Sequence, residues 1–144
     1  MTYATALYSR FTRRTPTTRS RRVLQAVLVT TGLVASGTGA AVAIAGPRAI
    51  PGGAPTAASN DSVMRFYAVW WAAQGPALWR LAREVDTDRR TFHTVCAVTF
   101  LGGLARLGAA RHSGRPHPLF EALTAFELLA PPLLVMWRRH VAEP

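Results

Sequence analysis

Two ionisable residues lie inside long apolar stretches of this chain, and the two stretches are consecutive. Arg106 lies within residues 91–110, and Glu127 lies within residues 118–137. Either stretch is long enough to cross a lipid bilayer, which takes about 20 apolar residues. An isolated charge at mid-depth costs at least ~2.5–3.5 kcal/mol, so each of these charges needs a partner. The sequence therefore predicts a helical membrane protein in which Arg106 and Glu127 pair with each other.

Composition agrees with a membrane protein. The 144 residues are 49% hydrophobic and carry a formal net charge of +10, and all 17 basic residues are arginines. A basic chain of this size could instead bind nucleic acid. Its arginines, however, cluster between apolar runs, without zinc-ligand spacing or a helix-turn-helix pattern. Nucleic acid is therefore not an expected partner, whereas the lipid bilayer is.

The chain alternates between apolar segments and polar or glycine- and proline-rich ones. We expect membrane spans at about residues 23–45, 63–81, 91–110 and 118–137. The second span is the weakest, because Arg65 lies near its start. Residues 23–140 are thus predicted to form one all-α, integral membrane four-helix bundle. Residues 1–22 contain six arginines and several threonines, a composition typical of a disordered basic arm.

The first apolar segment has a second interpretation. Arg21 and Arg22, an apolar run and the sequence 43–45 (Ala-Ile-Ala) also resemble a signal peptide with its cleavage site. The apolar stretch is longer than the usual core of a signal peptide, and three further apolar segments follow it. We favour an uncleaved span and leave cleavage open.

The distribution of arginines predicts the orientation in the membrane. Cytoplasmic segments of membrane proteins carry an excess of Lys and Arg. If both termini are cytoplasmic, twelve arginines lie inside, including Arg138 and Arg139 at the membrane surface, and three lie in the outer loops. Four spans require both termini on one side, which agrees with this count. The expected location is the cell membrane, crossed several times.

Helix geometry brings the two intramembrane charges to a similar depth. Side chains lean toward the N-terminus of their own helix, so Arg106 and Glu127 lean toward one another on antiparallel helices. The short polar turn at residues 111–117 makes these helices neighbours. Gly102 and Gly103 precede Arg106 by four and three residues, on the face that its side chain covers. Their missing side chains leave room for the guanidinium group or for another helix.

Two further charges extend this polar site. Arg65 and Glu121 each lie about three residues into a span that begins outside, so they are expected to form the mouth of a site whose floor is Arg106 and Glu127. Arg65 can also pair with Asp61 one turn earlier. Arginines suit an anionic head group, so a lipid or a small anionic ligand is the expected occupant. The Arg106–Glu127 pair could equally serve only to hold two helices together.

No catalytic motif accompanies these charges. The sequence shows no Ser-His-Asp order, phosphate-binding loop or HExxH element. His112 and His117 lack a carboxylate or cysteine at metal-ligand spacing. His93 is expected to lie at the interface or to pack, and the single cysteine, Cys96, suits a packing role. Neither a metal nor a cofactor is predicted.

The favoured function is that of a small, non-enzymatic membrane protein that binds a ligand, forms a homo-oligomer or serves as a subunit of a membrane complex. The alternative is a membrane enzyme or redox-complex subunit that uses Glu127 as an acid or base. Proton-coupled transport is a third hypothesis, and four spans would then require an oligomer.

Five short motifs between residues 25 and 138 also form a recognisable set. They are Ile50-Pro51-Gly52, Arg65-Phe66-Tyr67-Ala68, Leu101-Gly102-Gly103-Leu104-Ala105-Arg106, Gly114-Arg115-Pro116-His117-Pro118, and Glu127 before Pro131-Pro132. Together they resemble the uncharacterised bacterial membrane family called domain of unknown function 4345. The resemblance implies a four-span helical membrane protein of a kind common in actinobacteria, without an established activity.

The family pattern is matched at specific residues of this chain: Arg65, Gly102, Gly103, Arg106, Gly114, Pro116 and Glu127. The family is distantly similar to four-helix membrane proteins of the DoxX type, some of which are linked to redox systems. This sequence contains no haem, flavin or quinone motif that would support such a link.

Overall fold

The structure, a computed structural model, describes residues 18–142. This part of the chain contains four α-helices, one short 3-10 helix and no strand. The elements are α2 (Thr18–Ala45), η1 (Gly46–Ala49), α3 (Ala58–Arg83), α4 (Arg89–Ser113) and α5 (Pro118–Ala142). The prediction of an all-α fold built from four long helices is therefore confirmed.

The basic arm predicted for residues 1–22 lies mostly outside the described residues. Its last residues are helical, because they form the first turn of α2. Two side chains of this turn bond to distant parts of the fold. Ser20 Oγ accepts a hydrogen bond from Trp137 Nε1 at 2.7 Å, and Arg21 Nε donates to Asp86 Oδ2 at 2.6 Å. These contacts extend α2 beyond its apolar part.

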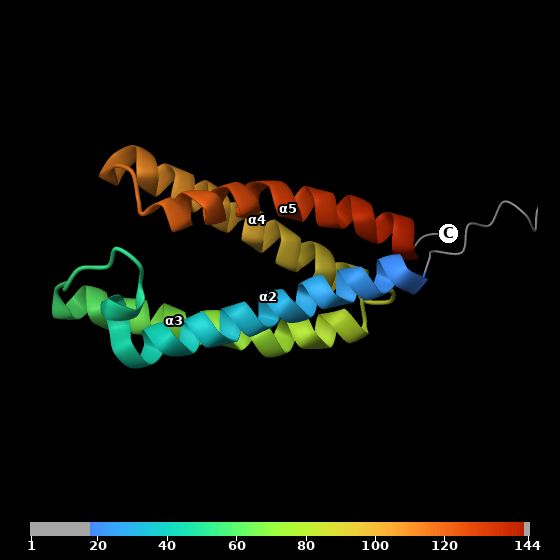
Figure 1. Ribbon diagram of the computed structural model, residues 1–144, viewed down its shortest axis with the longest axis horizontal. Helices are drawn as coiled ribbons and strands as arrows, with labels where there is room; N and C mark the ends of the chain where they lie inside the picture. The colour runs from blue at the N-terminus through green and yellow to red at the C-terminus, as the bar shows by residue number, and fades with distance from the viewer. Residues whose placement is uncertain (1–17, 143–144) are drawn as a thin grey trace, which may run out of the picture.

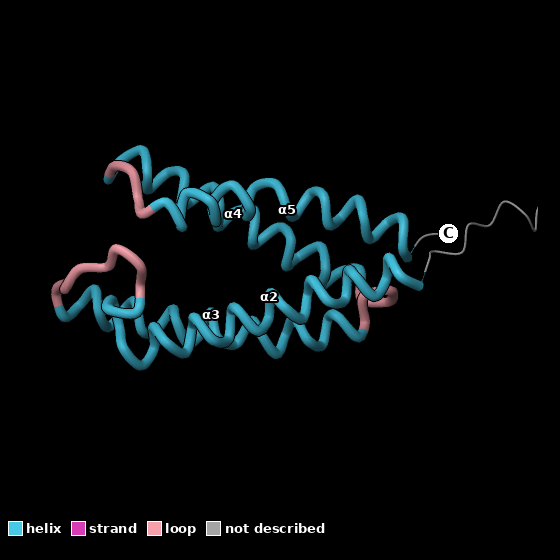
Figure 2. The backbone as a smooth tube through the Cα atoms, in the orientation of Figure 1, coloured by secondary structure: helices cyan, strands magenta, loops and turns pink. Residues whose placement is uncertain are grey.

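The four helices form two antiparallel hairpins, α2 with α3 and α4 with α5 (Figure 1). Figure 2 shows that the hairpins approach each other at the end where α2 begins and α5 ends, and diverge toward the opposite end. We call these the termini end and the loop end. The loop end holds residues 46–57 and the turn at residues 114–117.

Small residues allow α2 and α3 to pack closely along their length. A Cβ atom added at Gly39 would lie 2.5 Å from the backbone nitrogen of Ala72. One added at Gly75 would lie 2.6 Å from the carbonyl oxygen of Gly32 and would overlap Ser36 Oγ. Close approach at glycine is the usual way for helices to pack in lipid, where apolar burial does not drive association.

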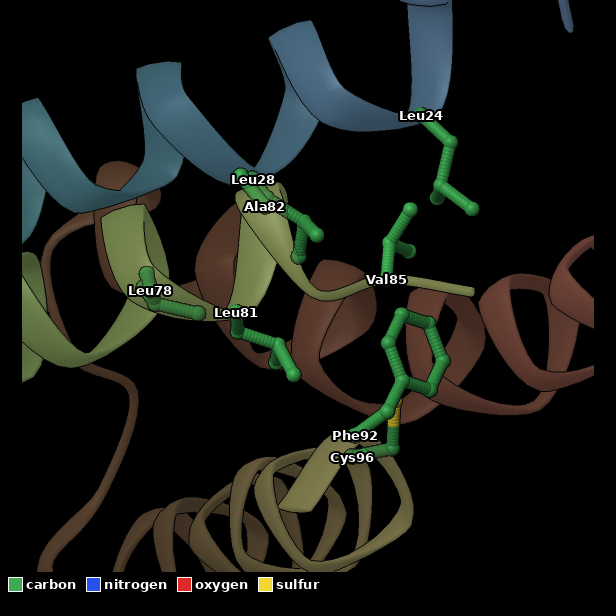
Figure 3. Packing of buried hydrophobic residues seen from close by; sticks show 8 residues of the cluster. All are labelled: Leu24, Leu28, Leu78, Leu81, Ala82, Val85, Phe92 and Cys96. Carbon is green, nitrogen blue, oxygen red and sulfur yellow. The ribbon is translucent and has the colours of Figure 1, made fainter. Parts of the chain in front are cut away.

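The core that both hairpins share lies at the termini end (Figure 3). Its buried members come from α2, α3, the loop after α3, and α4: Leu24, Leu28, Leu78, Leu81, Ala82, Val85, Phe92 and Cys96. Partly buried residues of α5 and α4 pack against this cluster. The hairpins are therefore joined at one end by an ordinary apolar core.

Arg138 of α5 also belongs to this junction. Its side chain is packed within the protein, and only 2% of the residue is exposed. Its guanidinium group lies 5.6 Å from the centre of the Phe92 ring and donates to carbonyl oxygens of the loop between α3 and α4. Arg138 is buried here because those carbonyls, which follow the end of α3, need donors that the loop itself does not supply.

Three of the helical segments are long and apolar enough to cross a membrane. They are Arg19–Ala49, Arg89–Ser113 and Pro118–Val141. The helix α3 is not among them, because its polar and charged residues, including Arg65, Gln74 and Arg80, dilute its apolar character. It nevertheless runs beside α2 throughout (Figure 1).

Candidate functional site

Residue counting places Arg106 and Glu127 on the sides of α4 and α5 that are turned toward the other hairpin. Residues seven apart lie on nearly the same face of a helix. On α4, Phe92 of the shared core lies two seven-residue intervals before Arg106. On α5, Leu134, which packs on that core, lies one such interval after Glu127. The two charges therefore lie on the same faces of α4 and α5 that, nearer the termini end, contact the α2–α3 hairpin.

The helix α3 presents a matching face. Leu81 is buried in the shared core, and Gln74 and Tyr67 precede it at intervals of seven residues. Tyr67 is 65% exposed. It is uncovered because the hairpins diverge toward the loop end (Figure 1).

The ion pair joins α4 to α5. Arg106 Nε lies 2.9 Å from Glu127 Oε2 and 3.1 Å from Glu127 Oε1. The Glu127 side chain is 14% exposed and the Arg106 side chain 42%. Gly103 allows this approach, since an added Cβ would lie 3.0 Å from Leu128 and 3.1 Å from the Cβ of Glu127. The glutamate is thus held between the helices, while the arginine remains accessible.

Phe120 supports the guanidinium group from the loop end. The Cζ atom of Arg106 lies 5.5 Å from the centre of the Phe120 ring, within the range of a cation–π interaction. Only Nε of the guanidinium is bonded within residues 18–142, which leaves both terminal amino groups without a hydrogen-bond partner there. Our sequence analysis missed Phe120. Its position seven residues before Glu127 was the available signal.

Arg65 forms its hydrogen bonds within the α2–α3 hairpin. Its Nη1 donates to the carbonyl oxygens of Ala43 at 3.0 Å and Ile44 at 2.7 Å, at the C-terminal end of α2. Its Nε donates to Asp61 Oδ2 at 3.0 Å, the contact with the preceding turn that the spacing predicts. Gly46 has a φ of +63°, and an added Cβ would lie 2.6 Å from Arg65 Nη2. Arg65 thus fastens the end of α2 to α3.

A shallow, open pocket lies between the loops at the loop end. Its volume is about 440 Å³, and its walls are Ile50 to Gly53 on one side and Arg115 to His117 with Phe120 on the other. Two of the motifs noted in the sequence, Ile50-Pro51-Gly52 and Gly114-Arg115-Pro116-His117-Pro118, therefore face one another. The sequence alone offered no sign of this, because the two segments are far apart in the chain.

Glu121 lies beside this pocket and pairs with a wall residue. Arg115 Nε donates to Glu121 Oε1 at 2.9 Å, and this contact raises the pKa of Arg115. Glu121 and Arg65 bond on different hairpins, so no hydrogen bond or ion pair joins the two residues that we expected at the mouth of the site. Gly102, expected beside Arg106, has open space around it, with nothing within 4 Å of an added Cβ.

The other candidate residues are dispersed. Cys96 is buried in the shared core. His93 Nε2 is buried without a hydrogen-bond partner within the described residues. Within residues 18–142, no three His, Cys, Asp or Glu side chains are grouped as metal ligands.

Comparison with known proteins identifies the family. The sequence model of the family described as domain of unknown function (DUF4345) matches residues 23–138. The match covers most of the chain, so the chain belongs to this family, as its motifs indicated. No curated protein and no solved structure matches the chain.

Proposed function

We propose that this member of the DUF4345 family is a non-enzymatic, four-span protein of the cell membrane that binds an anionic amphiphile at Arg106. Both termini would lie in the cytoplasm, in accord with the excess of arginines at the termini end. The loop end, with Arg106, Glu127 and Phe120, would then lie in the outer half of the membrane.

This proposal rests on the hydrogen-bond partners of the Arg106 guanidinium group. Glu127 holds it through Nε and Phe120 supports its flat face, so it is fixed in place before any ligand arrives. Its two terminal amino groups have no hydrogen-bond partner within residues 18–142. Unsolvated donors of a charged group are costly in lipid. A phosphate or carboxylate group matches the planar fork of an arginine and would satisfy both amino groups together.

The apolar part of the ligand would lie between the hairpins. Residue counting turns the face of α3 that carries Tyr67 and Gln74 toward the other hairpin, and on this face Tyr67 is exposed while Gln74 is partly buried. An acyl chain lying there would cover Tyr67 while its head group remained at Arg106. A lipid or an amphiphilic acid meets both requirements, whereas a small inorganic anion meets only the first.

A purely structural pair is the competing explanation. The decisive variant is the double substitution Arg106→Met/Glu127→Met, which removes the pair without leaving an unpaired charge. We expect the double variant to remain folded and to lose the anionic amphiphile that co-purifies with the parent protein, measured by mass spectrometry of extracts. Arg111→Gln, at the same end but outside the site, is the matched control. Retention of the same molecule by the double variant would refute the proposal.

One observation favours a second candidate, an enzyme or redox-complex subunit in which Glu127 acts as acid or base. Glu127 Oε2 is buried and accepts no hydrogen bond of good geometry within residues 18–142, although Arg106 Nε is close. A buried carboxylate beside a cation is a common setting for proton transfer. Visible absorbance or stoichiometric metal in purified protein, lost in Glu127→Gln, would favour this candidate over ligand binding.

A further inference from the structure

A second candidate site lies near the termini end of the α2–α3 hairpin, on a different face from the one that is turned toward Arg106. A groove of about 410 Å³ runs between the two helices there, and its walls are Val29, Leu33, Trp79 and Ala82. From the level of Gln25 to Leu33 the groove spans eight residues, or about 12 Å, which is most of the ~15 Å hydrocarbon thickness of one leaflet.

The polar groups along this groove are occupied by the protein itself. Gln25 Nε2 donates to the carbonyl oxygen of Ala82 at 2.9 Å, and Trp79 Nε1 donates to that of Val29 at 3.2 Å. These bonds join α2 to α3, and the surface of the groove is mainly apolar. The walls therefore suit an apolar chain, and Leu33 is 59% exposed.

Two arginines lie at the end of the groove nearest the termini. Arg83 lines the groove directly. Arg22 precedes Val29 by seven residues and so continues the same face of α2. Both residues are exposed, and within residues 18–142 neither guanidinium group forms a hydrogen bond or an ion pair. Positive charge is thus concentrated at the membrane-surface end of an apolar groove.

We propose that this groove binds a phospholipid with an anionic head group, from the leaflet at the termini end. One acyl chain lies along Val29 and Leu33, and the phosphate group lies between Arg22 and Arg83. Anionic lipid near the membrane surface attracts arginine, and two adjacent guanidinium groups bind phosphate through charge-assisted hydrogen bonds. This site does not depend on the one proposed at Arg106, because it lies at the other end of the molecule and on a different face.

The test uses the full-length protein in detergent, titrated with phosphatidylglycerol or phosphatidylcholine, with bound lipid counted by native mass spectrometry. We expect preference for phosphatidylglycerol in the parent. Arg22→Gln and Arg83→Gln should each weaken its binding about fivefold, the effect of one surface charge. Arg139→Gln, which removes an exposed arginine from the other hairpin at the same end, should leave binding unchanged.

A second pair of variants tests the groove itself. Leu33→Trp fills the groove without changing charge and should also weaken phosphatidylglycerol binding severalfold. Leu129→Trp places the same bulk on an exposed position of α5 and should have no effect. Equal loss in Arg139→Gln would show that surface charge alone attracts the lipid and would overturn the proposal. Unchanged binding in Leu33→Trp, or equal binding of the two lipids by the parent, would overturn it as well.

Discussion

Arg138 Nε donates a hydrogen bond of 2.8 Å to the carbonyl oxygen of Val85, and the two residues are 2% and 0% exposed. The bond joins α5 to the loop that connects the two hairpins. A second bond, from Arg138 Nη2 to the carbonyl oxygen of Asp86 at 3.1 Å, strengthens the same connection. The hairpins are therefore held together at the termini end by a buried cation as well as by apolar packing.

Arg138→Met should destabilise the protein by about 2 kcal/mol. The substitution keeps most of the side-chain volume but removes the Arg138 donors from one buried carbonyl group, that of Val85, and one partly buried carbonyl group, that of Asp86. An unsatisfied buried carbonyl group costs about 1–3 kcal/mol. Removing a buried charge offsets part of that cost. Thermal unfolding in detergent measures the effect, and Arg139→Met, at an exposed neighbouring position, should leave the melting temperature within error of the parent. Equal melting of both variants would contradict this role for Arg138.

The glycines of α2 offer a test with opposite expected signs. Gly39→Ala should destabilise the α2–α3 hairpin by about 1–3 kcal/mol, because the added methyl group meets the backbone of α3. Gly37→Ala adds the same group to the same helix where nothing lies within 4 Å. That variant should be neutral or up to ~1 kcal/mol more stable, since alanine is the better helix former. Denaturant titration followed by Trp fluorescence distinguishes the two, and equal effects would contradict the close packing described here.

Arg65→Met tests whether Arg65 belongs to its own hairpin or to the ligand site. The variant loses the donors to the Ala43 and Ile44 carbonyl groups and leaves Asp61 without its partner. We expect faster hydrogen exchange at the end of α2 and in residues 46–57, with no loss of the amphiphile that we propose to bind at Arg106. Loss of that molecule without a change in exchange would instead place Arg65 in the site.

The outcome at Arg65 shows what helix spacing can and cannot predict. The proximity of Arg106 and Glu127 follows from two antiparallel helices joined by a short turn, so residue counting suffices. The Asp61–Arg65 contact follows in the same way from local spacing. The bonds from Arg65 to the end of α2, and from Arg138 to the loop after α3, depend on which backbone carbonyl groups lack donors in the folded chain. Sequence periodicity carries no information about that requirement.

The arrangement of the hairpins lay beyond prediction for a related reason. The bundle was expected from four apolar segments, but each segment is apolar on several faces. Periodicity therefore does not say that α2 packs on α3 through Gly39 and Gly75, nor that the shared core is limited to one end. The pocket between residues 50–53 and the turn at residues 114–117 is a consequence of that arrangement.

Lowering the pH should destabilise the first turn of α4, because the Asp88 side chain caps this turn. The Asp88 carboxylate accepts a hydrogen bond of 2.9 Å from the backbone nitrogen of Thr91. Hydrogen bonding from the Thr91 side chain, and then from this backbone nitrogen, lowers the pKa of Asp88 below the ordinary value of 3.8. A carboxyl group with a lowered folded-state pKa stabilises the fold above the unfolded-state pKa and loses that contribution as the pH falls through the folded-state pKa. Asp88→Asn keeps an acceptor but does not titrate, so its stability should depend less on pH below 3.8. An unchanged slope of stability against pH in this variant would contradict the assignment.

The energy of the Arg106–Glu127 pair is measurable by a double-mutant cycle. Arg106→Met leaves the poorly exposed Glu127 carboxylate unpaired in an apolar helix and should cost about 2.5–3.5 kcal/mol. Glu127→Met should cost less, because the Arg106 side chain is 42% exposed and can turn toward water or head groups. The double variant leaves no uncompensated charge and should be more stable than the sum of the single effects predicts, by at least about 1 kcal/mol. Reversible unfolding in mixed micelles gives all four free energies, and additive effects, or single variants as stable as the parent, would show that the two groups do not stabilise one another.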